Sequence, residues 1–424
     1  MTHRCQILTL MLLLVVMHAT AQGDYCFYSF LEKDGLSDNA ITSIAEDGNG
    51  FMWIGSASGL MYYDGYSFHP INSGNDTHSL RGNHINDLAS DRQGNLWIAT
   101  ESSVCKYDIS TETFASYKTV RDGCEENSYQ ADKLFAMSDG RIRYFAARMY
   151  QLDTVSKCFE PVHDDYILRH RIRDCFQCSR DRFLMVSPSE KTIFLIDSNG
   201  NELSRITGGD TPDNNPYRRP YDIIEIDDYL FYIGGDNGVF LADTRARTIK
   251  KIDKIGNQKM PSQISSLYKD NITGDIWMGT NGEELHILSA DLKSITVIPS
   301  STSNYSTQML NSSTVLHIFK DSRNLLWFCT WHGLSILNTS SNHPFLNLTH
   351  PECDGIIPTS AISSIAESPS GLLAIATDGG GISFWDKHSP RCTDIKNAGQ
   401  HNQMPNQSLL AIAYDSKGNL YNGG

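Results

Sequence analysis

A pattern centred on tryptophan recurs along the chain and constrains its fold more than any other feature. The segment from Ile41 to Ser56 reads Ile-x-x-Ile, Asp-x-x-Gly and Trp-Ile-Gly-Ser, and the segment from Ile85 to Thr100 follows the same order. Two further copies carry Trp277 and Trp327 at the same point. Weaker copies put other residues there, namely Arg143, Tyr232, Ala374 and Tyr421, and one near Phe183 is inferred from spacing. Copies spaced by about 40–50 residues are typical of repeat architectures.

Each copy predicts a four-stranded antiparallel sheet. An apolar run such as Ile41 to Ala45 forms the first strand, and Asp-x-x-Gly makes a tight turn into the second. Asn324 replaces the glycine of that turn in one copy, and Asn tolerates a positive φ better than most residues. A Ser/Thr-x-x-Gly turn leads to the third strand, and an edge strand such as Phe68 to Ile71 follows. The chain is therefore predicted to be all-β.

Four short strands per repeat indicate a β-propeller, because one such sheet cannot bury both of its faces without neighbours. The recurring tryptophans are interpreted as packing between blades, not as catalytic groups. The segment from Cys26 to Phe30 resembles a fourth strand that precedes the first repeat. We expect it to complete the last blade and close the ring.

Charge and cysteine content exclude several classes of protein. The formal net charge of -14 gives no basic surface for a phosphate backbone, so nucleic-acid binding is not expected. Cys175 and Cys178 are the one close cysteine pair, without the second pair that a zinc ribbon needs, and we interpret them as ordinary strand residues. No metal-binding spacing, cofactor motif or catalytic constellation is found, so none of these is predicted.

The N-terminus has the organisation of an export signal. Basic His3 and Arg4 precede the apolar run Ile7 to Met17, and Ala19-Thr-Ala21 is a small-residue cleavage site. The apolar run is too short to span a bilayer of about 30 Å. Residues 1–21 are therefore predicted to be a cleaved signal peptide, and the mature chain to be periplasmic.

The repeats are similar to those of a known family. Phe30-Leu-Glu-Lys-Asp34-Gly-Leu-Ser37, followed by the Asp47 turn, Trp53-Ile-Gly and Gly59-Leu-Met-Tyr-Tyr-Asp64-Gly, resembles the two-component regulator propeller repeats of bacterial hybrid sensor histidine kinases. In that family two seven-bladed propellers and a β-sandwich precede a membrane helix, a kinase and a DNA-binding output domain. The resemblance implies sensing of glycan fragments or another small periplasmic ligand, and signalling through one membrane helix favours a homodimer.

The resemblance also divides the chain. Residues 22–348 are expected to form a first, seven-bladed propeller, and residues 349–424 the first blades of a second. The ninth repeat stops just after Tyr421, so we expect the sequence to be the front portion of a longer inner-membrane sensor. The chain itself carries no kinase, and membrane attachment would come through the missing C-terminal part.

A ligand is expected on one face of the propeller, where the loops before each first strand and the turns between second and third strands meet. Trp331 is the main candidate, because it lies in a polar turn and offers a flat platform for a sugar; the alternative, and the more frequent role, is that it only covers a neighbouring blade. Arg218 and Arg219 suit an acidic sugar, but two arginines in a proline-flanked loop are more often solvated or paired. The candidate ligand-binding residues are Trp331, His332, Asn281, Glu283, Asn39, Arg81, His84, Arg218, Arg219 and Asp236.

Two alternatives to a sensor stay open. A secreted propeller lyase or glycosidase needs paired carboxylates or a positioned His or Tyr, and the sequence offers no pair fixed by spacing. A propeller scaffold that binds protein partners is the other alternative, because propeller faces serve that role too.

Overall fold

The computed structural model describes residues 25, 27–74, 76, 78–121, 124–125, 131–208, 216–217, 219–300, 309–338, 361–378, 381–386, 396–397 and 409–423. The predicted signal peptide and Arg218 lie outside these residues. The chain divides into two compact units. The first, called the ring unit, comprises Phe27–Thr302 and Thr307–Ser340. The second, called the C-terminal unit, contains the described residues after Ser340.

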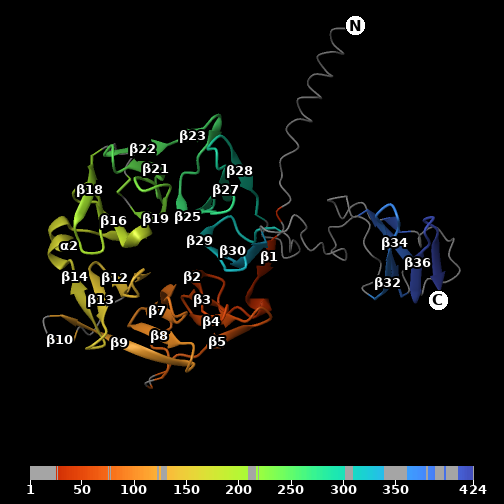
Figure 1. Ribbon diagram of the computed structural model, residues 1–424, viewed down its shortest axis with the longest axis horizontal. Helices are drawn as coiled ribbons and strands as arrows, with labels where there is room; N and C mark the ends of the chain where they lie inside the picture. Colours follow the sequence, from red (N-terminus) through yellow and green to blue (C-terminus); the bar gives the residue numbers. More distant parts are fainter. Residues whose placement is uncertain are drawn as a thin grey trace, which may run out of the picture. The chain divides into compact units, whose positions relative to one another are not determined.

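The ring unit is built from antiparallel meanders in which successive strands pair in chain order. Figure 1 shows these meanders around a common centre, with β2, β19, β25 and β29 toward the centre and β5, β9, β18 and β22 farther out. Five of its sheets have four strands each, within the described residues. The strands of these five sheets are β1 (Phe27–Phe30), β2 (Ile41–Glu46), β3 (Met52–Ser56), β4 (Gly59–Tyr63), β5 (Phe68–Ile71), β15 (Asp174–Cys178), β16 (Arg182–Ser187), β17 (Thr192–Ile196), β18 (Glu202–Thr207), β19 (Pro220–Glu225), β20 (Leu230–Gly235), β21 (Gly238–Asp243), β22 (Thr248–Ile252), β25 (Ile264–Lys269), β26 (Ile276–Thr280), β27 (Leu285–Leu288), β28 (Ile295–Ile298), β29 (Val315–Lys320), β30 (Leu325–Thr330) and β31 (Gly333–Asn338).

Two further meanders join into one nine-stranded sheet. The edge strands β9 and β14 pair in parallel, which links β6–β9 to β11–β14, and β10 extends the sheet from β9. Separate blades were expected, and the long β9 makes the link because it continues beyond its own meander. The strands are β6 (Ile85–Ser90), β7 (Leu96–Thr100), β8 (Val104–Asp108), β9 (Thr113–Arg121), β10 (Cys124–Glu125), β11 (Lys133–Ala136), β12 (Ile142–Phe145), β13 (Met149–Asp153) and β14 (Cys158–Val162).

Short elements connect the meanders. Helix α2 lies between β14 and β15, where only strands were expected, and it buries Ile167 against Phe183 and Phe194 of the next meander. These elements are η1 (Glu32–Asp34), α2 (Asp164–His170), η2 (Ser179–Asp181), and the small hairpin of β23 (Lys254–Ile255) and β24 (Gln258–Lys259).

The ring closes with the strand that precedes the first repeat, as predicted. Strand β1 pairs antiparallel with β31, with Phe27 opposite Leu337 and Phe30 opposite Leu334. The last sheet therefore has the order β1-β31-β30-β29 and takes strands from both ends of the ring unit.

The Asp-x-x-Gly turns form as predicted and also anchor the tryptophans. The Asp47 carboxylate accepts hydrogen bonds from the N–H groups of Asn49 (2.9 Å) and Phe51 (3.0 Å) through Oδ1, while Oδ2 accepts one from Trp53 Nε1 (2.8 Å). Asn324 takes the glycine position with a φ of +67°, in agreement with the prediction. The same carboxylate-to-indole bond joins Asp91 to Trp97 (3.0 Å) and Asp321 to Trp327 (3.1 Å).

The four repeat tryptophans pack between meanders, as predicted. Trp53 is 1% exposed and lies in one apolar cluster with Ile85 and Leu88 of the next meander. Trp327 is fully buried and packs with Ile41 and Ile44, which carries the same contact across the point of closure. Such aromatic packing makes each meander depend on its neighbour for its core.

The glycine after Trp-Ile has a packing role. A Cβ at Gly55 would lie 2.5 Å from Cγ2 of Ile85, closer than real Cβ contacts allow. The missing side chain lets the second strand approach the first strand of the next meander.

The C-terminal unit repeats the same local structure. Its strands are β32 (Ile362–Glu367), β33 (Leu372–Thr377), β34 (Gly381–Asp386) and β35 (Lys396–Asn397) in one sheet, and β36 (Ala411–Tyr414) and β37 (Leu420–Gly423) in another. Its core gathers Ala374, Ala376, Ile382, Leu409 and Ile412. No helix among the described residues of either unit is long and apolar enough to cross a membrane.

Candidate functional site

The two predicted sets of loops contact each other on one face of the ring unit, called the loop face below. The Glu101 carboxylate, in the turn between β7 and β8, accepts hydrogen bonds from the N–H groups of Asn83 (3.1 Å) and His84 (3.0 Å), which precede β6. Glu283, between β26 and β27, accepts one from the N–H of Ser262 before β25 (3.1 Å). In every meander the first strand is the inner one and the strands follow outward in chain order. The loop before the first strand and the turn between the second and third strands therefore lie on the same face of the ring in each meander.

Through these hydrogen bonds Glu101 and Glu283 have a structural role. Each carboxylate holds the loop in front of its own first strand. A ligand that recruits either oxygen must compete with backbone N–H donors, so these carboxylates position the loops.

The candidates nearest to ring closure come from neighbouring turns. The N–H of Trp331 donates to the carbonyl oxygen of Thr314 (3.2 Å), and Asn281 forms a β-bridge with the same Thr314. On the other side, the N–H of Gly333 donates to the carbonyl oxygen of Asn39 (2.8 Å). The structure thus brings Asn281, Trp331, His332 and Asn39 into one group, called the seam cluster.

The Trp331 side chain is exposed at the centre of the seam cluster. Its exposed fraction is 58%, whereas the repeat tryptophans are buried. The turn beneath it is fixed, because Thr330 Oγ1 donates to the carbonyl of Gly333 (2.9 Å) and Asn311 Nδ2 donates to the carbonyl of His332 (2.9 Å). An exposed indole on a fixed turn is a suitable surface for stacking against a flat or apolar ligand face.

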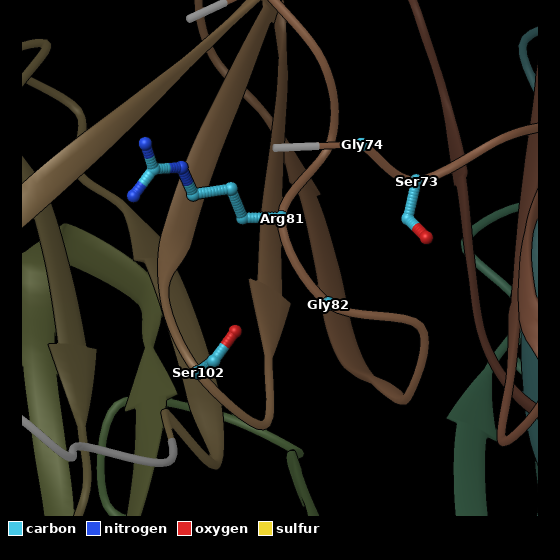
Figure 2. A pocket seen from close by; sticks show the side chains of 5 residues that line it. All are labelled: Ser73, Gly74, Arg81, Gly82 and Ser102. Atoms are coloured by element: carbon cyan, nitrogen blue, oxygen red, sulfur yellow. The ribbon is translucent and has the colours of Figure 1, made fainter. Parts of the chain in front are cut away.

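Arg81 and His84 precede β6, away from the seam cluster in sequence. Arg81 lines a pocket of about 470 Å³ together with Ser73, Gly74, Gly82 and Ser102. Figure 2 shows the Ser102 hydroxyl directed toward the segment that carries Arg81 and Gly82, while the Arg81 side chain extends away from Ser73. The pocket offers hydroxyl groups and backbone polar atoms, which suit a polar ligand.

Arg219 and Asp236 form a third location. Asp236 lies in the turn after β20, Arg219 precedes β19, and both hydrogen-bond the side chain of Tyr221. Burial and the hydrogen bond to Asp236 raise the pKa of the Tyr221 hydroxyl. A Cβ at Gly235 would lie 2.6 Å from the carbonyl oxygen of Arg219, so this glycine allows the turn to approach the loop.

A second pocket of about 400 Å³ lies beside Arg219. Its lining residues are Arg171, Arg173, Asp174, Pro188, Ser189, Tyr217 and Arg219. Arg219 was predicted from the sequence, whereas Arg171 and Arg173 were not. The Arg-x-Arg spacing immediately before the strand at Asp174 was the available signal, in the part of the chain where the repeat is weakest.

The ring centre carries charged side chains that were not predicted as site residues from the sequence. Ser43 Oγ donates to Asp87 Oδ1 (3.0 Å), and Asp87 Oδ2 accepts a bond from the N–H of Leu134 in the next meander (2.8 Å). Asp222 Oδ2 in turn accepts one from the N–H of Leu267 (2.8 Å). These bonds run from one first strand to the next, which identifies the carboxylates as parts of the framework of the ring.

The environment of these acids perturbs their titration. Burial raises the pKa of both Asp87 and Asp222, and the backbone N–H donors and the charge of His317 oppose that rise. Burial lowers the pKa of Lys133, against the charges of Asp174 and Asp222. The signal in the sequence is positional, because Asp87 and Asp222 occupy the place that Ser43 and Ser266 hold in other copies.

The cysteine pair lies on β15, as interpreted from the sequence. Cys175 and Cys178 are buried thiols, and burial raises the pKa of Cys178 to about 12 and that of Cys175 further. Such thiols stay protonated and are poor nucleophiles and metal ligands. Within the described part of the chain, no group of three or more His, Cys, Asp or Glu residues is arranged to hold a metal ion.

Comparisons with known proteins agree with the repeat structure. Residues 35–58 and 79–102 match the family model described as "Two component regulator propeller". A comparison with curated proteins gave no match.

Solved structures share the fold at low sequence identity. The chain is similar to the extracellular domain assigned to the hybrid two-component system BT3049 from B. thetaiotaomicron, with a TM-score of 0.61, 21% identity and coverage of 94% of this chain and 52% of that one. The extracellular domain of BT4673 from the same organism gives a TM-score of 0.58, 17% identity and coverage of 94% and 51%. The chain therefore spans about half the length of these two structures.

An enzyme shares the ring architecture as well. A virginiamycin B lyase from Staphylococcus aureus is similar with a TM-score of 0.53, 12% identity and coverage of 74% of this chain and 99% of that one. At these identities the likeness shows the fold alone, and it leaves open whether a binding protein or an enzyme uses it.

Proposed function

We propose that this chain, which carries two-component regulator propeller repeats, is the ligand-sensing region of a hybrid two-component sensor and recognises oligosaccharides. Two repeats match the family model, and the fold is that of the extracellular domains of such systems. The proposal includes a seven-bladed first ring over residues 22–348 and the first blades of a second propeller over 349–424. A longer product would carry the kinase and output domains.

The observation that carries the proposal is the exposed Trp331 in the seam cluster. An indole face that is 58% exposed offers a platform for the apolar face of a sugar ring. Asn281 and Asn39 contact Thr314 and Gly333 in the same cluster, and amides can pair with sugar hydroxyls. A stacking surface edged by neutral polar groups matches a saccharide better than a peptide or a nucleic acid.

The proposed location follows from the same assignment. Residues 1–21 would direct export and be removed, which would leave the ring in the periplasm, with membrane attachment supplied by a later segment. A homodimer would let paired sensors transmit the signal across the membrane.

The test is calorimetric titration of the exported chain with a panel of plant and host oligosaccharides. We expect one class to bind and Trp331→Ala to lower its affinity about tenfold or more, because the stacking surface is lost. Tyr66→Ala is the matched control, since Tyr66 is 93% exposed in the turn between β4 and β5 and away from the seam cluster. Equal effects of the two substitutions would remove Trp331 from the site, and no binding by any saccharide would refute the proposal.

A second candidate function is an enzyme, favoured by the charged ring centre with Asp87, Asp222 and His317. Raised carboxyl pKa values are a feature of acid–base catalysts. The same panel tests this candidate, because chromatography after long incubation would reveal cleaved products. Product formation by the unmodified chain would establish the enzyme, whereas binding without products supports the sensor.

A further inference from the structure

The second pocket on the loop face concentrates positive charge in an acidic protein. Arg171 and Arg173 precede β15 and Arg219 precedes β19, so two loops from neighbouring meanders supply the three side chains. The formal net charge of the whole chain is -14. Three arginines around one pocket are therefore a local reversal of the surface potential.

The guanidinium groups of these arginines are not engaged in salt bridges among the described residues, and all three side chains are exposed. Asp174 also lines the pocket, but it interacts with the charges of both Lys133 and Arg173. Asp236 and Arg219 both hydrogen-bond the Tyr221 hydroxyl. The pocket lining therefore holds three guanidinium groups and one carboxylate, that of Asp174.

The backbone holds two of these arginines in an uncommon conformation. Arg171 has a φ of +50° and Arg219 a φ of +47°, a region that few residues other than glycine adopt. The N–H of Arg171 ends helix α2 by donating to Leu168 (3.3 Å), and the close approach of Gly235 fixes the carbonyl of Arg219.

The other lining residues and the guanidinium groups together suit a sugar that carries an anion. Tyr217 is fully buried in the apolar cluster beneath the pocket, and its hydroxyl donates to the carbonyl of Gly208. Pro188 and Ser189 also line the pocket and supply an apolar ring and a hydroxyl group. Guanidinium groups bind carboxylate and sulfate through paired, charge-assisted hydrogen bonds.

We propose that the pocket of Arg171, Arg173 and Arg219 binds the oxyanion group of an acidic oligosaccharide, a carboxylate or a sulfate on the sugar. This inference rests on the proposed sensing function and names its ligand class. The shared chemistry is the oxyanion, and the two sources are uronic acids and sulfated sugars.

The experiment is calorimetric titration of the exported chain with three sets of oligosaccharides. The carboxylate set comes from polygalacturonate and alginate, the sulfate set from carrageenan, and the neutral set from galactan and mannan. We expect one acidic set to bind and its affinity to weaken with added salt, because the interaction is between charges. Arg173→Gln and Arg219→Gln should each lower that affinity about ten- to a hundredfold.

Arg92→Gln is the matched control. Arg92 is exposed in the turn between β6 and β7, on the face of the ring opposite the loop face, and the same charge is removed there. An equal loss in Arg92→Gln would overturn the pocket and assign the effect to net charge. Thermal unfolding of each variant at the wild-type temperature shows that the fold is retained.

The three oligosaccharide sets distinguish the sensing function from the acidic-ligand inference. Binding of the neutral set alone overturns the acidic-ligand inference and leaves the sensing function supported. Binding of no set refutes both. Acidic binding that survives the Arg173→Gln, Arg219→Gln double substitution overturns the pocket assignment.

Discussion

Strands β2 and β32 occupy the same place in the repeat but differ in burial. Ile41 and Ile44 in the ring unit are 0% and 2% exposed, whereas Ile362 and Ile365 in the C-terminal unit are 44% and 58% exposed. The local hydrogen bonds are the same, including the register shift after the first residue of each strand. The difference teaches that the first strand of a repeat is folded by its own sequence but buried by its neighbours.

The largest expected effect removes a contact between neighbours. Trp327→Ala should lower the free energy of unfolding of the ring unit by about 3–5 kcal/mol, because it empties a buried indole site and breaks the bond to Asp321. Urea denaturation measures the change. Trp331→Ala is the control, and its effect on unfolding should stay within about 0.5 kcal/mol, since that side chain is exposed. Comparable losses would contradict the assigned packing roles.

A pair of isoleucine substitutions tests the comparison directly. Ile44→Ala should cost about 2–5 kcal/mol, as for other large-to-small changes in a core. Ile365→Ala should cost less than about 1 kcal/mol, because its side chain is already largely in water. Hydrogen exchange followed by mass spectrometry on the β2 and β32 peptides reports each region separately. An equal loss of protection in both would break the distinction between the units.

The smallest expected effect is on the pKa values of carboxyl groups in turns whose hydrogen bonds come from within the same turn. Hydrogen bonds from Ser110 hold the pKa of Asp108 at about 2, and the side chain of Asn419 is the main cause that lowers the pKa of Asp415 below 3.8. Since both folded pKa values are depressed, each carboxylate stabilises its turn fully above pH 3.8 and loses that contribution as pH falls through the folded value.

Carbon NMR titration of the two carboxyl groups provides the measurement. Ser110→Ala should raise the pKa of Asp108, and Asn419→Ala that of Asp415, each without affecting the other. A normal pKa for Asp415 beside a depressed one for Asp108 would mean that even the turns depend on the closed ring.

The repeat frame was predictable because it rests on local signals. The Asp47 turn, the Asn324 substitution and the interpretation of Trp53 and Trp327 as packing residues depend on spacing within one repeat, and the structure confirms them. The closing role of Phe27 to Phe30 was also readable, since an unpaired edge strand before the first repeat needs a partner.

The features that were not predicted depend on how neighbouring meanders are arranged around the ring. Asp87 and Leu134 are 47 residues apart in sequence, and only the arrangement of first strands around the centre brings them within 2.8 Å. Likewise Arg173 and Arg219 line one pocket because two weakly conforming repeats lie side by side. No pattern inside a single repeat encodes contacts between two repeats, so these contacts could not be predicted from the sequence.

The antiparallel pairing of β1 with β31 has a mechanical consequence. Phe27 lies opposite Leu337, so the chain enters and leaves this pair at the same end. Tension applied between Phe27 and Leu337 would separate the two strands by breaking their hydrogen bonds one after another. It would not load all of these bonds at once, as a force along the strands would. A force that pulls on both ends of the ring unit would therefore load the β1–β31 hydrogen bonds one at a time, beginning at Phe27 and Leu337.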